Sequence, residues 1–117
     1  MDFEKLEIWR RSIQLSAEVY KALAGLRDFG FKDQITRSGL SVPSNIAEGM
    51  TRRTPKDKMH FLLIAKGSCS ELRTQTYIGL EIGYIGHELG NHWIKETKEI
   101  ASMISGLINK LKLEADS

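Results

Sequence analysis

Two histidines in the segment His87–His92 (HELGNH) come nearest to a catalytic metal motif. Zinc proteases place two histidines four residues apart on a helix, so that both imidazoles face one metal ion. Here the separation is five residues, which turns the second imidazole roughly 140° away from the first on a regular helix. Because Gly86 and Gly90 lie close by, we predict a polar turn over Gly86–Gly90 and no metal site.

Cys69 is the other side chain with nucleophilic chemistry, and it is the single cysteine of the chain. A lone cysteine forms neither an internal disulfide nor a cysteine-based zinc site, and it suits a reducing compartment. No histidine lies at a helical spacing that would activate the thiol, so we predict a small buried residue. His60, beside Phe61, is interpreted as a surface or interface residue. We therefore predict no enzyme activity and no cofactor.

A polar stripe follows one helical segment, with residues spaced by four, four and three positions. Its members are Arg37, Ser41, Asn45 and Glu48. A second polar set follows further along the chain, at Ser68, Glu71 and Gln75. Two interpretations stay open. The first is a buried or half-buried network joining Arg37 to Glu48 or Glu71, which would favour one register of packing. The second is a solvated helix face.

A basic segment over residues 51–58 holds four cations, namely Arg52, Arg53, Lys56 and Lys58. Lysine and arginine side chains neutralise phosphates, and four of them correspond to at most about four phosphate contacts, which give weak and salt-sensitive binding. The net charge of +2 does not indicate nucleic-acid binding by itself. The alternative is a solvated connection between helices.

The elements that position these residues are predicted to be helices, because the apolar residues recur with helical spacing along almost the whole chain. The first helix covers about 20 residues up to Gly25. Its predicted apolar face consists of Leu6, Trp9, Ile13, Ser16, Tyr20 and Leu23, with Ala17, Val19 and Ala24 alongside. The second runs from about Lys32 to Ala47. It contains Pro43, which predicts either one kinked helix or two short ones.

The third helix is predicted to begin at Pro55 and to end near Ile85, and the fourth to begin near Asn91. A line of small and apolar residues from Phe61 to Gly83 marks the packing seam of the third helix. Four helices with short connections predict an all-α, antiparallel up-down-up-down four-helix bundle, formed by residues 1–117 as a single domain.

Contact between copies of the chain is a further expectation, because there are more apolar positions than one bundle core can use. The candidates are Tyr77, Tyr84, Trp93 and Ile94. The charged N-terminal segment has no apolar stretch typical of a secretory signal, and the longest uncharged runs, Ser38–Ala47 and Ile100–Asn109, are too short to span a membrane. We therefore expect a cytoplasmic protein without a membrane partner.

The stretch Gln34–Gly49, above all Ser41–Gly49 (SVPSNIAEG), resembles the four-helix-bundle proteins encoded in intervening sequences of bacterial 23S ribosomal RNA genes. The stretch Phe61–Ser68 and the pair Glu71-Leu72 carry the same resemblance, as do Trp9, Val19 and Tyr20. By matched position, the family-pattern polar residues are Arg37, Asn45, Glu48, Ser68 and Glu71, which we interpret as structural or interfacial.

This resemblance implies a ring-shaped homo-oligomer, expected to be a pentamer, without enzyme activity. Related bundles that accompany diversity-generating reverse transcriptases bind nucleic acid through a basic ring surface and contact the polymerase. The leading hypothesis is accordingly an oligomeric bundle that binds RNA or DNA. The alternative is a protein-interaction or accessory subunit that binds another protein and no nucleic acid.

Overall fold

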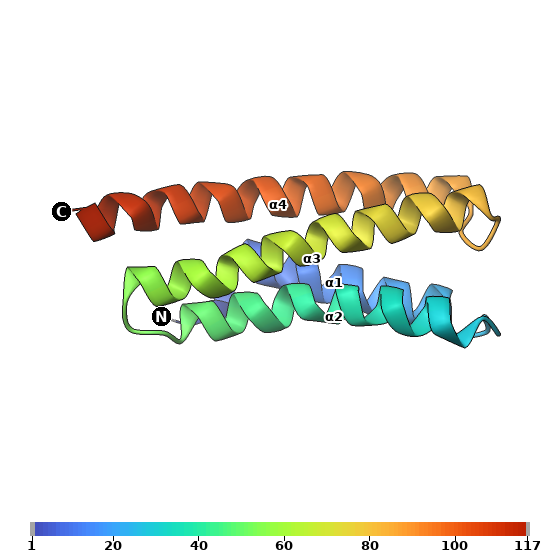
Figure 1. The fold of residues 1–117 in the computed structure, drawn as a ribbon, viewed down its shortest axis with the longest axis horizontal. Coiled ribbons are helices and arrows are strands. Elements are labelled where there is room, and N and C mark those ends of the chain that lie inside the picture. The colour runs from blue at the N-terminus through green and yellow to red at the C-terminus, as the bar shows by residue number, and fades with distance from the viewer. Residues whose placement is uncertain (1, 117) are drawn as a thin grey trace.

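The computed structural model describes residues 2–116, and every element in that range is helical. A 3-10 turn, η1 (Phe3–Lys5), precedes four α-helices: α1 (Glu7–Ala22), α2 (Phe29–Met50), α3 (Pro55–Glu81) and α4 (His87–Asp116). Successive helices run in opposite directions along a bundle whose principal extents are 50 × 22 × 19 Å (Figure 1). The all-α prediction is confirmed.

Side-chain caps determine where two of the helices begin. The Asp28 carboxylate accepts a hydrogen bond from the Phe31 N–H and so caps α2. The Thr54 hydroxyl caps α3 in the same way, by accepting from the Asp57 N–H. Pro55 follows as the first helical residue, where its missing N–H costs nothing. Asp28 also accepts a bond from the Tyr84 hydroxyl at 2.9 Å, which ties the α1–α2 connection to the α3–α4 connection.

The observed helix boundaries correct two sequence predictions. The second helix begins at Phe29 rather than Lys32, and it runs as one helix through the buried Pro43 to Met50. The predicted turn over Gly86–Gly90 is wrong, since α4 already begins at His87. Gly90 is there for close packing: a Cβ at this position would lie 2.4 Å from Cδ2 of Leu80 on α3.

The predicted apolar face of α1 is buried only in part: Ser16, Val19 and Leu23 are buried as predicted. Ile13 and Tyr20 are 41% and 48% exposed, whereas Leu15 and Val19 lie in the core. The buried line includes the small residue Ser16, and a Cβ built on Gly39 of α2 would lie 3.6 Å from the Ser16 Cα. Because α1 approaches α2 closely, the side of α1 that carries the small residue Ser16 faces the core, and the bulkier Ile13 and Tyr20 lie outside it.

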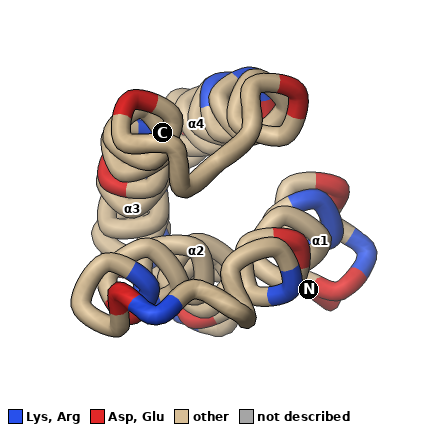
Figure 2. Tube along the Cα trace, turned by 90° about the vertical axis from the view of Figure 1, so that its right-hand side faces the viewer, with Lys and Arg blue, Asp and Glu red and all other residues tan. Residues whose placement is uncertain are grey.

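Helix α1 and helix α4 are the more widely separated neighbours around the bundle (Figure 2). Polar side chains link them. Arg11 on α1 donates to the carboxylates of Glu96 and Glu99, the latter at 2.7 Å. Glu18 accepts a bond of 3.3 Å from the indole N–H of Trp93, whose side chain is fully buried. This side of the bundle is thus joined by half-buried ionic contacts, whereas the other pairs of neighbouring helices pack over longer apolar seams.

Candidate nucleic-acid interface

The antiparallel topology brings two basic segments together at one end of the bundle. The α2–α3 connection lies at the same end as the last turns of α4 (Figure 1). Side chains from both segments line two shared clefts there: Lys56 and Lys112 line one, and Lys58 and Lys110 line the other. We call this surface the cationic end, and it comprises Arg52, Arg53, Lys56, Lys58, Lys110 and Lys112.

Local contacts hold two of these cations in place. The Arg52 guanidinium pairs with Glu48 and lies 4.7 Å from the centroid of the Phe61 ring, in a cation–π contact. The Lys58 ammonium donates to the Met50 carbonyl at 3.3 Å.

The remaining four cations of the cationic end have no protein hydrogen bond or ion pair within residues 2–116; these are Arg53, Lys56, Lys110 and Lys112. The acidic residues in these segments and in the last turn of α2 are Glu48, which pairs with Arg52, and Asp57, Glu114 and Asp116. The six cations of the cationic end therefore outnumber the four acids of these segments, and four of the cations keep their full capacity for phosphate.

The polar stripe divides into a solvated ionic part and a hydroxyl contact between helices. Arg37 is 76% exposed and pairs with Asp33 at 3.0 Å. Because Glu48 pairs with Arg52, the expected ion pairs from Arg37 to Glu48 or Glu71 are absent from the described part of the chain. Arg37 and Glu71 nevertheless line a common cleft of about 280 Å³ between α2 and α3.

Beneath that cleft, the Ser68 hydroxyl of α3 donates to the Ser41 hydroxyl of α2 at 2.8 Å. The Asn45 amide donates to the same Ser41 oxygen at 2.9 Å. Residues 41, 45 and 68 thus form a small network that sets the register of α2 against α3. One carbonyl oxygen nearby, Oε1 of Gln75, is buried without a hydrogen-bond partner among residues 2–116.

The histidine and cysteine candidates take structural positions. Both His87 and His92 lie in α4, and His92 Nε2 is 3.3 Å from a carboxylate oxygen of Glu18. Within residues 2–116, no group of three or more metal-ligating side chains converges. Cys69 is buried in the core, and desolvation raises the pKa of its thiol to about 12, so the thiol stays protonated near neutral pH.

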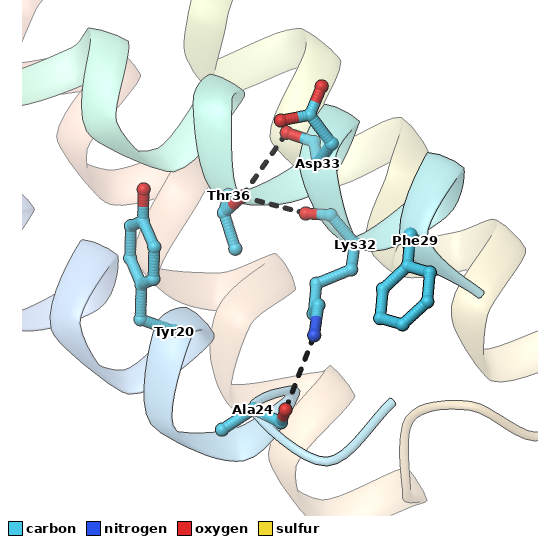
Figure 3. Close-up of a pocket in the computed structure, with 6 residues that line it drawn as sticks. All are labelled: Tyr20, Ala24, Phe29, Lys32, Asp33 and Thr36. Carbon is cyan, nitrogen blue, oxygen red and sulfur yellow. Dashed lines mark hydrogen bonds between the residues drawn. The ribbon is translucent and has the colours of Figure 1, made fainter. Parts of the chain in front are cut away.

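A separate hollow of about 470 Å³ lies where α1 ends and α2 begins (Figure 3). Tyr20 and Phe29 contribute aromatic rings to its lining. The Lys32 ammonium at this hollow donates to the Ala24 carbonyl at 3.3 Å and lies 5.0 Å from the centroid of the Phe29 ring. Because that cation is already engaged, the hollow suits an apolar partner better than a phosphate.

The residues proposed for contact between copies have different environments. Trp93 is fully buried in its own core, and Tyr84 packs edge to face on Phe31, with ring centroids 5.3 Å apart. Tyr77 is 51% exposed on the outer face of α3, and the adjacent Ile78 is 48% exposed. The outer surface of α3 is therefore the better candidate for such a contact.

Sequence reasoning missed Lys110 and Lys112. The signal was present, because an antiparallel bundle places the end of the fourth helix beside the start of the third. Lys110 and Lys112, near the end of the fourth helix, therefore belong to the same basic surface as Lys56 and Lys58. No helix within residues 2–116 is long and apolar enough to cross a membrane.

These features define an all-helical four-helix bundle with a cationic end and, within residues 2–116, no cluster of three or more metal-ligating side chains. The chain belongs to the 23S rRNA-intervening sequence protein family, whose model matches residues 4–106.

A similar solved structure is a protein described as having unknown function, from the S23 ribosomal protein family of Bacteroides thetaiotaomicron. It is 24% identical, superimposes with a TM-score of 0.81, and the match covers 86% of this chain and 97% of that one. No curated protein matches this chain.

Proposed function

We propose that this chain is a non-enzymatic helical bundle that assembles with copies of itself and binds RNA or DNA through the cationic end. The observation that carries the proposal is that four lysine side chains of α3 and α4 line two adjoining clefts, next to Arg52 and Arg53 of the α2–α3 connection. RNA is the first ligand to test, because the family description refers to 23S rRNA.

Assembly would make this surface more effective than its charge per subunit indicates. A handful of phosphate contacts gives weak binding at physiological salt. When several copies are held together, the second and later contacts are intramolecular, and avidity can exceed the single-site affinity by about 10²–10⁴. The exposed apolar residues on α3 and the aromatic hollow between α1 and α2 supply surfaces for such contacts.

The test measures the affinity of the chain for a labelled RNA by fluorescence anisotropy across a salt series. We expect the Arg52→Ala/Arg53→Ala double variant to bind more weakly and to lower the slope of log K against log salt by about 1.4 units for a single strand. The Lys21→Ala/Lys98→Ala double variant, which removes two exposed cations elsewhere, should keep the wild-type slope.

Absence of wild-type RNA and DNA binding even at low salt would overturn the nucleic-acid part of this proposal. The second candidate function is then a protein-interaction or accessory subunit, which the exposed apolar side chains favour. A pull-down at high salt separates the two, because salt screens phosphate contacts and leaves apolar helix contacts intact.

A further inference from the structure

One of the two clefts at the cationic end is lined by both cationic and apolar side chains. It lies between the first turns of α3 and the last turns of α4, and its volume is about 370 Å³. That is within the range of about 300–1,000 Å³ typical of small-ligand sites. The lining residues are Lys56, Met59, His60 and Leu63 from α3, with Ile108 and Lys112 from α4. We call it the α3–α4 cleft.

Each helix contributes a cation and an apolar surface to this cleft. Lys56 and Lys112, one on each helix, have no hydrogen-bond or ion-pair partner within residues 2–116. Ile108 is buried and Leu63 is 56% exposed, so together they form an apolar base that opens to solvent. The cleft therefore matches a ligand that is both anionic and apolar.

An aromatic side chain adds a flat surface to the lining. The His60 ring packs edge to face against the Phe61 ring, with centroids 5.0 Å apart and planes at 79°. Phe61 in turn lies under the Arg52 guanidinium, so His60 is joined to the rest of the cationic end through these ring contacts. A nucleobase can stack on such a ring whatever its sequence, because every base has a π-face.

We propose that the α3–α4 cleft receives an unpaired nucleobase, with the adjoining phosphates contacting Lys56 and Lys112. This inference rests on the proposed nucleic-acid function and narrows it to single-stranded or bulged segments, because bases in a duplex are already stacked and paired. Lys112 lies beyond residues 4–106, the segment that matches the family model. The C-terminal turns of α4 complete the cleft.

The test compares three labelled ligands by anisotropy at low salt: a single-stranded RNA, a duplex of the same length and inorganic polyphosphate. We expect the wild type to prefer the single strand over the duplex. The His60→Ala/Leu63→Ala variant should bind the single strand about fivefold or more weakly, which corresponds to the loss of one stacked base. Its binding of polyphosphate should be unchanged, because all six cations remain.

The matched control is Ile82→Ala/His87→Ala, which removes similar exposed side chains at the opposite end of the bundle and should leave all three affinities unchanged. Equal wild-type affinity for the single strand and the duplex would overturn the cleft proposal, as would an equal loss of polyphosphate binding in the cleft variant. A higher affinity for free adenosine monophosphate than for the single strand would assign the cleft to a free nucleotide and overturn the strand assignment. If none of the RNA and phosphate ligands binds, the proposed function itself fails.

Discussion

At the scale of single residues, charged side chains join α1 to α4. Arg11 is 22% exposed and contacts Glu96, which is 18% exposed, and Glu99. The hydrogen bonds that Arg11 donates to these two carboxylates raise the pKa of its guanidinium above the ordinary value. The hydrogen bond from Arg11 in turn lowers the pKa of the Glu99 carboxyl. The three groups form one half-buried unit that none of the sequence motifs pointed to.

We expect Arg11→Met to lower the free energy of unfolding by about 1–3 kcal/mol, because Glu96 would keep its low exposure without its cation. Because methionine keeps much of the length of the arginine side chain, the loss in the free energy of unfolding reports on the removed charge. Urea denaturation at neutral pH measures it. An exposed pair gives the control: Arg37→Met, at the 76% exposed Arg37, should change stability far less. Equal effects of the two substitutions would contradict a special role for Arg11.

The cluster of Arg11, Glu96 and Glu99 also predicts how the stability difference between wild type and Arg11→Met depends on pH. The pKa of Glu99 is depressed in the folded state, so its contribution is present above its ordinary value of 4.5 and is lost as pH falls through the folded value. The gap in melting temperature between wild type and Arg11→Met should therefore narrow below about pH 4.5. A gap that stays constant down to pH 3 would indicate that packing, not charge, is responsible.

At the scale of elements, the buried face of a helix was predictable wherever small and apolar residues formed a single line along it. The seam on α3 lies buried as predicted at Ala65, Leu72 and Thr76. For α1 the prediction was right for Ser16, Val19 and Leu23 and wrong for Ile13 and Tyr20, because spacing alone does not indicate which side of the helix packs closely on α2. Gly90 was misread for a related reason: a glycine used for close contact between helices has the same sequence signal as one used in a turn.

Close helix contact also gives an element-scale prediction at Gly49 of α2. A Cβ there would lie 3.0 Å from the backbone carbonyl oxygen of Lys58 on α3, and that oxygen cannot move without shifting its helix. We expect Gly49→Ala to lower the melting temperature. Gly106→Ala on α4 is the matched control, because nothing lies within 4 Å of its Cβ position. It should instead stabilise the protein by about 0.5–1 kcal/mol through helix propensity. A stabilising Gly49→Ala would contradict the close packing of α2 on α3.

The candidate site, at the scale of the whole molecule, depends on topology more than on local sequence. Arg52, Arg53, Lys56 and Lys58 could be identified as one basic segment because they are neighbours in the chain. Their pairing with Lys110 and Lys112 needed the antiparallel arrangement of α3 and α4 and the length of α4, which reaches Asp116. The polar stripe failed as an ionic network because partners four residues away in the chain engage both groups: Asp33 pairs with Arg37, and Arg52 pairs with Glu48.

Assembly is the last property that belongs to the whole molecule, and the outer face of α3 is where it can be tested. Tyr77 and Ile78 are 51% and 48% exposed there, and an apolar face of this kind is stabilised when a second copy covers it. We expect light scattering to give a mass several times 13.2 kDa for the wild type and a lower mass for Tyr77→Glu/Ile78→Glu. The Gln14→Glu variant on α1 controls for added charge. If copies share one RNA strand, the α3 variant should also bind RNA about 10²-fold or more weakly, although its cationic end is intact. A wild-type mass of about 13.2 kDa would overturn the assembly, and the cationic end would then have to bind RNA with the contacts of one subunit.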